Sequence, residues 1–381
     1  MATHILSVLF LSGLLTTMPN TNLAKKHGHP KMNAIDACWR GNPKWAKQRQ
    51  ELAKCSVGFA GKMTNNVGED VTNYVVTDPS DDPVNPKRGT LRYGVTMIKR
   101  RVWITFKKDM NIKLRRTLLV GSFTAIDGRG ANVQISNGGC LFLHKAADVI
   151  IHGLAIHHCR HQPAGQVMGP GSKLIHLSEM DGDAIRLVAS RKVWIDHNTL
   201  YQCDDGLIDV TLGSTDITIS NNWFRDHDKV MLLGHDDAFN ADKKMKVTVV
   251  YNKFGPNCNQ RMPRVRHGYA HVVNNLYLGW QIYAIGGSMN PTVKSESNLF
   301  VAPKSGSKEI IRKINKSKGK AWNFQSVGDI LENGASFREI GSGTVKPNYN
   351  SKQIFPVTNA RTVRQLTSSA GALHCREGYP C

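Results

Sequence analysis

The clearest pattern along this chain is a run of β-branched residues that ends in an asparagine, with an aromatic residue or a leucine two positions later. The pattern recurs across residues 193–300, and its asparagines are 24, 30, 23 and 23 residues apart. These asparagines are Asn198, Asn222, Asn252, Asn275 and Asn298. Residues 150–156 fit an earlier copy, with Gly153 in the asparagine position. A period in the twenties without intervening helices predicts a solenoid of parallel strands.

Stacking of such coils explains why a polar residue returns at a fixed position. Each coil adds strands about 4.8 Å from the previous ones, and asparagine side chains at one turn can hydrogen-bond from coil to coil. A β-sandwich or barrel is the alternative, but antiparallel hairpins would not hold an asparagine at this period. We therefore predict an all-β solenoid.

The flanking sequence is less regular. Residues 102–106 and 118–120 are short β-like runs. Residues 40–54, between Cys38 and Cys55, are rich in Lys, Arg, Gln and Ala and predict a short amphipathic helix. From residue 304 to residue 366 the repeat fades into polar sequence, which predicts a C-terminal segment wrapped on the solenoid. We expect one domain over residues 25–381.

The charge balance indicates the class of partner. The chain has 381 residues, with 50 Lys and Arg against 29 Asp and Glu, and a formal net charge of +21. Such a charge favours a polyanion, which can be nucleic acid, an acidic membrane or an acidic polysaccharide. Nucleic acid is disfavoured because no basic patch is interleaved with aromatic residues.

The first 24 residues indicate secretion. They contain no Lys, Arg, Asp or Glu, and residues 5–15 form an apolar run that is too short to span a bilayer. A cleaved secretory signal over residues 1–24 fits this composition. We expect a monomer, secreted to the extracellular space or cell wall and free of the membrane after signal cleavage. The usable N-glycosylation sequon begins at Asn315.

Secretion makes disulfides plausible for the eight cysteines. Proximity in the chain favours Cys38 with Cys55 and Cys375 with Cys381. Cys140 and Cys159 are 19 residues apart, near one coil, so their separation suits a disulfide. Cys203 and Cys258 fall two coils apart, which is roughly 9–10 Å and too far for a disulfide. The hypothesis is three disulfides and two free thiols.

Four aspartates fall in two short runs that otherwise resemble strands. Asp181 and Asp183 are two residues apart, and Asp205 and Asp209 are four apart, so each pair would share a face of an extended strand. If the runs lie side by side, up to four carboxylates converge, and a cluster of this kind needs a cation such as Ca²⁺. The alternative is that these are ordinary turn aspartates beside glycines.

Cationic residues follow on the next coils. Lys229 lies on a strand-like run, and Arg261, Arg264 and Arg266 follow at short spacing. A solvated basic face is the ordinary explanation for such a run. In a solenoid, however, the aspartates, Lys229 and Arg261 stack on successive coils and form one groove. Bound Ca²⁺ among cationic side chains would hold a carboxylated ligand.

Eight short motifs are spread along the chain after the signal. They are Cys38-Trp39-Arg40, Gly89-Thr90-Leu91-Arg92, Ile126-Asp127-Gly128-Arg129-Gly130, Trp194-Ile195-Asp196-His197, Asp205-Gly206-Leu207-Ile208-Asp209, Arg261-Met262-Pro263-Arg264, Tyr283-Ala284-Ile285-Gly286-Gly287-Ser288 and Leu366-Thr367-Ser368-Ser369-Ala370-Gly371. Together they resemble the plant pectate lyases of polysaccharide lyase family 1, over nearly the whole chain after the signal. Several stretches are most similar to the pectate-lyase-like major pollen allergens of conifers and ragweed.

The resemblance implies a right-handed, single-stranded parallel β-helix and Ca²⁺-dependent β-elimination of de-esterified pectin (polygalacturonate), which yields 4,5-unsaturated oligogalacturonides. It implies calcium ligation by Asp181, Asp205 and Asp209, with Asp183 as a further acidic ligand. Arg261 matches the catalytic arginine, and Lys229 and Arg266 match cations that bind the substrate. The sequence departs from the family at Val265, where a cysteine is common, and over residues 160–173, so groove shape and chain-length preference are open.

Two other functions remain open. One is a secreted allergen or binding protein that keeps the fold with little or no activity, against which the intact site residues argue. The other is a pectic hydrolase, which would use paired carboxylates without calcium and release no unsaturated ends.

Overall fold

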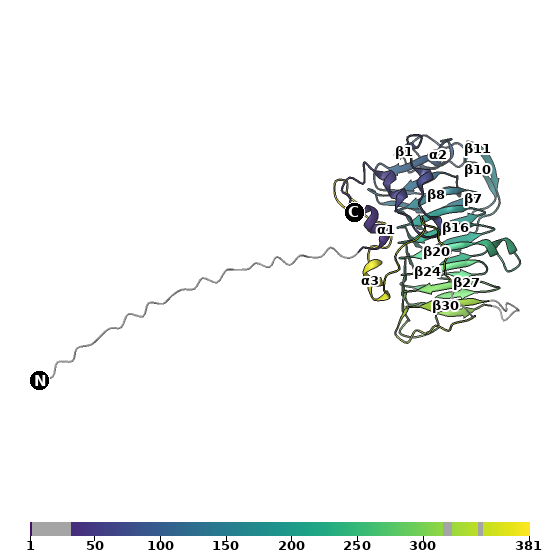
Figure 1. The fold of residues 1–381 in the computed structure, drawn as a ribbon. Helices are drawn as coiled ribbons and strands as arrows, with labels where there is room; N and C mark the ends of the chain where they lie inside the picture. Colours follow the sequence, from purple (N-terminus) through teal and green to yellow (C-terminus); the bar gives the residue numbers. More distant parts are fainter. Residues whose placement is uncertain (2–31, 315–321, 342–345) are drawn as a thin grey trace. The chain divides into compact units, whose positions relative to one another are not determined.

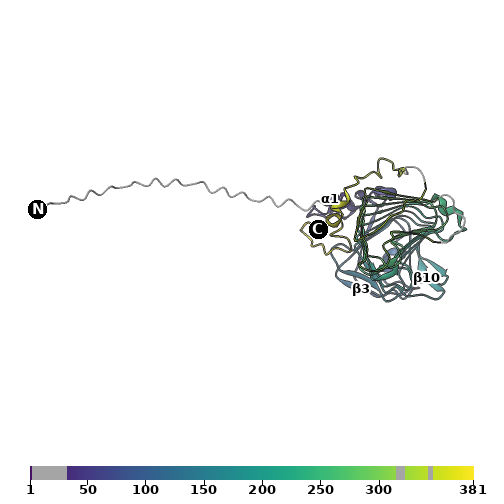
Figure 2. The ribbon, with the colours of Figure 1, turned by 90° about the horizontal axis from the view of Figure 1, so that it is seen from below.

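The computed structural model describes Met1 and residues 32–314, 322–341 and 346–381. The expected signal peptide and the sequon at Asn315 lie outside these residues. Met32–Cys381 forms one compact unit, in which parallel strands stack coil upon coil (Figure 1). The view from below the stack shows the sheets enclosing a common interior (Figure 2). The predicted solenoid is confirmed as a parallel β-helix.

Within the described residues the strands form three long parallel sheets. The ten-stranded sheet contains, in stacking order, β1 (Thr72–Val76), β2 (Val102–Phe106), β5 (Thr124–Asp127), β8 (Ala147–His152), β13 (Arg191–Asp196), β16 (Thr215–Ser220), β20 (Lys246–Val250), β24 (Tyr269–Val273), β27 (Thr292–Glu296) and β30 (Asn323–Val327).

The nine-stranded sheet contains β3 (Met110–Ile112), β6 (Val133–Ser136), β9 (Ala155–His157), β14 (Thr199–Tyr201), β17 (Trp223–Arg225), β21 (Lys253–Phe254), β25 (Leu276–Leu278), β28 (Leu299–Val301) and β31 (Ile330–Glu332). The eight-stranded sheet contains β4 (Leu118–Val120), β7 (Leu141–His144), β12 (Ile185–Val188), β15 (Ile208–Thr211), β19 (Met231–Leu233), β23 (Arg264–Val265), β26 (Ile285–Gly287) and β29 (Ile311–Lys313).

In the part of the chain that the structure describes, two strand pairs lie outside the long sheets. The pair β10 (Gly165–Gly169) and β11 (Lys173–Leu177) is an antiparallel hairpin. The pair β18 (His227–Lys229) and β22 (Cys258–Gln260) is parallel. The helices are α1 (Ala34–Trp39), α2 (Leu91–Thr96) and α3 (Val363–Leu366), with 3₁₀ turns η1 (Arg49–Lys54), η2 (Gly58–Ala60), η3 (Thr64–Asn66), η4 (Asn240–Lys244) and η5 (Ala360–Thr362).

The recurring asparagines form the predicted ladder. Asn198 Nδ2 donates to Asn222 Oδ1 at 3.1 Å, and the same contact repeats through Asn252 and Asn275 to Asn298. The backbone N–H of each asparagine donates to the same oxygen. The ladder ends on Asp329, whose Oδ1 accepts from Asn298. The aromatic residue two positions later also stacks between coils, as in Phe224 on Phe254.

One detail of the repeat was predicted wrongly. The register pairs Asp196 with His152, so Gly153 aligns with His197 and Leu154 takes the asparagine position. Gly153 and His197 both have a positive φ, of 77° and 53°. The glycine therefore fills the left-handed turn position that precedes the asparagine.

Two predictions about the flanks also need correction. The expected helix over residues 40–54 is replaced by turns and the short η1, because Gly41 and Pro43 interrupt any helix there. The solenoid also continues beyond residue 304 through β29, β30 and β31, so the wrapping segment begins later than predicted. Residues 346–381 then return along the turns, where Gly371 donates to Asn221 O and Thr358 N to Asn274 Oδ1.

The cysteine hypothesis is confirmed. Disulfides join Cys38 to Cys55, Cys140 to Cys159 and Cys375 to Cys381. Cys203 and Cys258 are free, and burial raises the pKa of each thiol to about 12. Neither thiol is therefore a ready nucleophile.

Candidate active site

One column of side chains on the outer face of the eight-stranded sheet organises the site. The register aligns Leu119, Phe142, Arg186, Asp209, Leu232, Arg264, Gly286 and Arg312 across adjacent strands. Their neighbours in each strand point into the core, because side chains alternate along a strand. The column is therefore apolar at the β4 end, acidic at β15 and cationic from β23 onward.

The four predicted aspartates gather around the acidic part of this column. Asp209 lies in β15, whereas Asp181, Asp183 and Asp205 lie in the loops before β12 and β15, so the expectation that they all lie on strands is wrong. Asp183 is buried, and its Oδ1 accepts from Gly206 N at 2.8 Å while its Oδ2 has no partner. Asp181 projects further into solvent than Asp183, so this pair does not share one environment.

Burial and mutual repulsion raise the pKa of two of these carboxyl groups. Burial, with the charges of Asp181 and Asp205, raises the pKa of Asp183 to about 6. Burial and the charges of Asp183 and Asp205 raise the pKa of Asp209 well above its ordinary value. The buried carboxyl groups of Asp183 and Asp209 have too little positive charge around them to offset this repulsion. A bound cation would supply that charge.

The close packing of two aspartates around Gly206 distinguishes this cluster from ordinary turn aspartates. A Cβ on Gly206 would lie 2.7 Å from Asp209 Oδ1 and 2.9 Å from Asp183 Oδ1. Only a glycine lets both carboxylates approach the chain this closely. The alternative that these aspartates serve only as turn residues is therefore disfavoured.

The donor set fits a hard cation by its chemistry. Carboxylate oxygens are the ligands that Ca²⁺ prefers, and the unpartnered Oδ2 of Asp183 is available. Two other carboxylates are engaged, because Arg186 donates to Asp181 at 2.5 Å and Lys229 donates to Asp205 at 2.6 Å. Among the described residues no three acidic, His or Cys side chains are already arranged as metal ligands. In both ion pairs the cation contacts Oδ1, so the Oδ2 atoms of Asp181 and Asp205 are the oxygens that calcium ligation would use.

Cationic side chains line the next coils, as predicted. Arg261 precedes β23, and its backbone oxygen accepts from Met231 N at 2.7 Å. Burial and the neighbouring Arg266 and Arg261 lower the pKa of the Arg264 guanidinium. Burial also lowers the pKa of Arg266, whose Nη1 donates to Gly234 O at 2.8 Å. The buried Nε of Arg261 has no hydrogen-bond partner, and the guanidinium lies near the hydroxyl of Tyr283.

Comparison with known proteins identifies the family of this chain. The family model for pectate lyase matches residues 47–374. The chain belongs to the pectate lyase family. The "Probable pectate lyase 4" of Arabidopsis thaliana is 48% identical, with 99% of this chain and 98% of that protein covered. The "Pectate lyase" of Zinnia elegans is 49% identical, with 92% and 87% covered.

A solved relative shows the same fold. The crystal structure of jun a 1, the major allergen from cedar pollen, is 49% identical, with a TM-score of 0.86 and with 90% of this chain and 99% of that chain covered. The resemblance drawn from the motifs, to pectate lyases and to a conifer pollen allergen, is confirmed at the level of family and fold. In the described part of this pectate lyase, no helix is long and apolar enough to cross a membrane.

The sequence did not reveal some residues of this pectate lyase site. Arg186 holds Asp181 and shares the outer column with Asp209. Tyr283 interacts electrostatically with Arg264 and Arg261, and burial raises the pKa of its hydroxyl. The alternation of side chains along a strand could have placed Arg186 on the outer face. The Tyr283-Ala284-Ile285-Gly286-Gly287-Ser288 motif could have indicated Tyr283.

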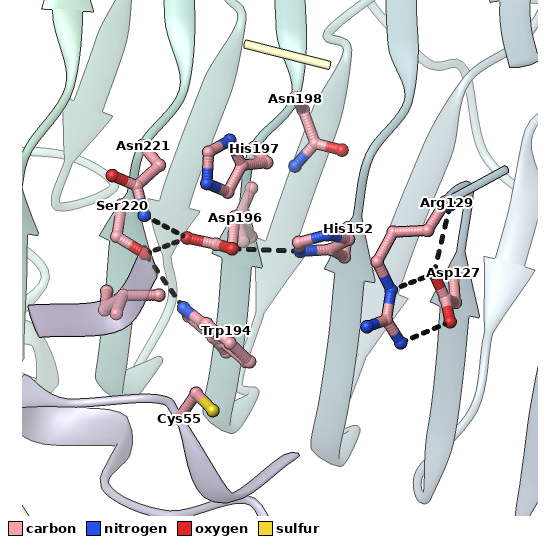
Figure 3. Close-up of polar contacts among 12 residues, drawn as sticks. Cys55, Asp127, Arg129, His152, Trp194, Asp196, His197, Asn198, Ser220 and Asn221 are labelled. Atoms are coloured by element: carbon pink, nitrogen blue, oxygen red, sulfur yellow. Dashed lines mark hydrogen bonds and ion pairs between the residues drawn. The ribbon is translucent and has the colours of Figure 1, made fainter. Parts of the chain in front are cut away.

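A second group of ionisable residues lies on and beside the ten-stranded sheet (Figure 3), and α1 packs on it through Asp36 and Trp39. Asp196 accepts from Ser220 Oγ at 2.6 Å and contacts His152 at 2.9 Å. Asp127 pairs with Arg129 at 2.8 Å, and His197 contacts Asp36 of α1 at 2.7 Å. These side chains are buried, so the Trp194–His197 motif holds the fold together and does not face substrate.

Proposed function

We propose that this chain is a secreted, Ca²⁺-dependent pectate lyase that cleaves de-esterified homogalacturonan by β-elimination. The observation that carries the proposal is the crowding of Asp183 and Asp209, with raised pKa values, beside the cationic row of Lys229, Arg261, Arg264 and Arg266. An acidic cluster that needs a cation, next to side chains that bind anions, suits a polymer of galacturonate.

Each residue has a role in this proposal. Asp181, Asp183, Asp205 and Asp209 hold Ca²⁺, which when bound neutralises a galacturonate carboxylate and makes the C5 proton more acidic. Lys229 leaves Asp205 and pairs with a substrate carboxylate, as does Arg266. Arg261 removes the C5 proton, the C5–H electron pair forms the C4–C5 double bond, and the C4–O bond breaks. The leaving oxygen then takes up a proton.

The location of the reaction follows from the rest of the chain. We propose that residues 1–24 are a cleaved signal, that residues 25–381 act as a single monomeric domain, and that the cell wall is the place of action. The net charge of +21 attracts the acidic polysaccharide over a distance set by ionic strength.

A second candidate is a pectate-binding allergen with little turnover. It is favoured by the ion pairs that already engage Asp181 and Asp205 and by the similarity to a pollen allergen. A pectic hydrolase is disfavoured, because the family model and the relatives that match this chain are pectate lyases.

One assay separates these functions. Purified protein is incubated with polygalacturonate, and the ultraviolet absorbance of unsaturated ends and the total reducing ends are measured together. A lyase produces both signals in equal amounts, loses both with a chelator and regains both with added Ca²⁺. A hydrolase produces reducing ends alone, and a binding protein produces neither although it retains polygalacturonate on a column.

A further inference from the structure

A second feature of the eight-stranded sheet lies at the opposite end from the arginines. A cavity of about 380 Å³ is bounded by the outer face of the sheet and by the hairpin β10–β11. Leu119, Phe142, Val188, Ile175 and Met180 make most of its wall apolar. Apolar side chains on the outer face of a sheet need a cover or a ligand, and the hairpin covers them only in part.

The hairpin is held in place by contacts with the solenoid. Ser172 N donates to Thr96 O at 2.9 Å, and Met168 N donates to Pro83 O at 2.6 Å. Arg116 Nη1 donates to Pro163 O at 2.5 Å. A Cβ on Gly169 would lie 2.4 Å from Ile175 Cδ1, so the two strands are tightly packed. The cavity is therefore formed before any ligand arrives.

The strand register joins this cavity to the candidate active site. Phe142 aligns with Arg186, and Arg186 aligns with Asp209. Each step is one strand, so Phe142 lies roughly 10 Å from Asp209 along the stack. A polymer that lies on the outer face and reaches the aspartates at one point enters the cavity one or two sugar residues away.

The charge of the cavity differs from that of the cationic row. Arg186 is its one lining Lys or Arg, and its guanidinium is engaged by Asp181 at 2.5 Å. The other polar lining side chains are His144, His176 and Ser178. A free carboxylate would lose water here without gaining an ion pair, which costs free energy. A methyl ester would bury its methyl group at no such cost.

We propose that this cavity is a subsite for a methyl-esterified galacturonate residue. The inference rests on the proposed function and refines it. The substrate is partly esterified pectin, with a neutral residue on the β7 side of the cut and free carboxylates on the β23 side. Burial of one methyl group corresponds to a preference of about three- to fourfold, or about 0.8 kcal/mol, for the ester over the acid at this position.

The test maps methyl esters relative to the cut. Randomly and partly methyl-esterified oligogalacturonates are digested at pH 8 with Ca²⁺, and tandem mass spectrometry locates the esters in the products. Wild type is compared with Phe142→Lys, with Val188→Lys as a second cavity variant. The matched control is Val75→Lys, because Val75 is also an exposed apolar residue (46%) but lies on β1 of another sheet.

The expected result is an ester enriched about three- to fourfold at one fixed position on one side of the cut. Phe142→Lys and Val188→Lys abolish this enrichment, because the new ammonium group favours a free carboxylate at the same position. Val75→Lys keeps the enrichment. If Phe142→Lys does not fold by circular dichroism, Val188→Lys decides the question.

Esters that are random or depleted at that position in wild type overturn the inference, as does enrichment that persists in a folded cavity variant. Absence of unsaturated products from every substrate rejects the proposed function instead. In that case calorimetric binding of hexagalacturonate, with and without methyl esters, to wild type and the same variants decides the subsite. Equal affinity of wild type for both ligands then rejects it.

Discussion

Two groups of aspartates lie on different sheets of the same solenoid and differ in how they are paired. Beneath α1, burial opposes ionisation of Asp127, but Arg129 and Arg49 outweigh it and lower its pKa far below the ordinary value. On the eight-stranded sheet, burial and neighbouring carboxylates raise the pKa of Asp183 to about 6. The residue type and the depth of burial are alike, and the direction of the shift is opposite.

The contrast separates structural from functional use of a buried charge. A paired carboxylate holds segments together and is costly to remove. A carboxylate left beside like charges destabilises the protein unless a ligand is bound, and such groups are typical of functional sites. The predictions below test this distinction, and they begin with the largest expected effect.

Replacing the proposed base should give the largest change. Arginine stays protonated at ordinary pH and is therefore a poor general base, so its position at C5 must account for its role. Arg261→Lys keeps the charge but not the reach or the planar geometry, and we expect kcat to fall by about 10²- to 10⁴-fold. Steady-state kinetics from pH 6 to pH 10 and a direct measurement of substrate binding provide the check. A raised KM with kcat preserved would assign Arg261 to substrate binding alone.

Removing a carboxylate from the paired group should unfold the protein more readily. Asp127→Asn leaves the buried Arg129 without its counter-ion, at a cost of about 3–5 kcal/mol. Asp209→Asn removes a repelled charge and should leave the stability of the calcium-free protein unchanged or slightly higher. Urea unfolding of both variants without Ca²⁺ is the measurement. Equal losses of stability in the two variants would show that burial alone, and not pairing, sets the cost.

Calcium dependence should report on the crowded group. Asp205→Asn and Asp209→Asn each remove a charged ligand, and we expect the Ca²⁺ concentration for half-maximal activity to rise on the order of tenfold. Asp204→Asn is the matched control, since Asp204 pairs with Arg160 at 3.0 Å on the surface. Calcium titration of activity, with circular dichroism to verify folding, compares the three variants. A similar rise in Asp204→Asn would point to a general effect of net charge.

The last prediction concerns pH and the attachment of α1. Burial opposes protonation of His197, but Asp36 and Asp196 outweigh it and raise its pKa. The stabilisation is therefore complete below the ordinary histidine value of about 6.5 and is lost as pH rises through the folded value. His197→Gln should cost about 1.5–3 kcal/mol at pH 6, and less at higher pH. Denaturant unfolding from pH 5 to pH 9 tests this, and a pH-independent difference would contradict it.

The sequence was sufficient for the features that depend on periodicity. The spacing of asparagines predicted the solenoid. Proximity in the chain and coil positions predicted the disulfides, and coil positions also placed the aspartates near Lys229 and Arg261. It could not show that Asp205 is already paired with Lys229 or that Asp181 is paired with Arg186, because these contacts depend on side-chain direction between coils. It also could not place the hairpin β10–β11, whose position is set by contacts distant in sequence.

The asparagine ladder has a consequence for how such a chain changes length in evolution. Each rung presents the next with the same donor and the same acceptor, so duplication or loss of a whole coil would leave the ladder continuous. Asp329 differs, because an ionised carboxylate only accepts and the series of identical donors stops there. Whole coils could therefore be added or lost within the stack, but the ladder cannot be extended beyond Asp329. The coils that carry Asp209, Lys229 and Arg261 are the exception, because one additional coil between them would separate the aspartates from the arginines.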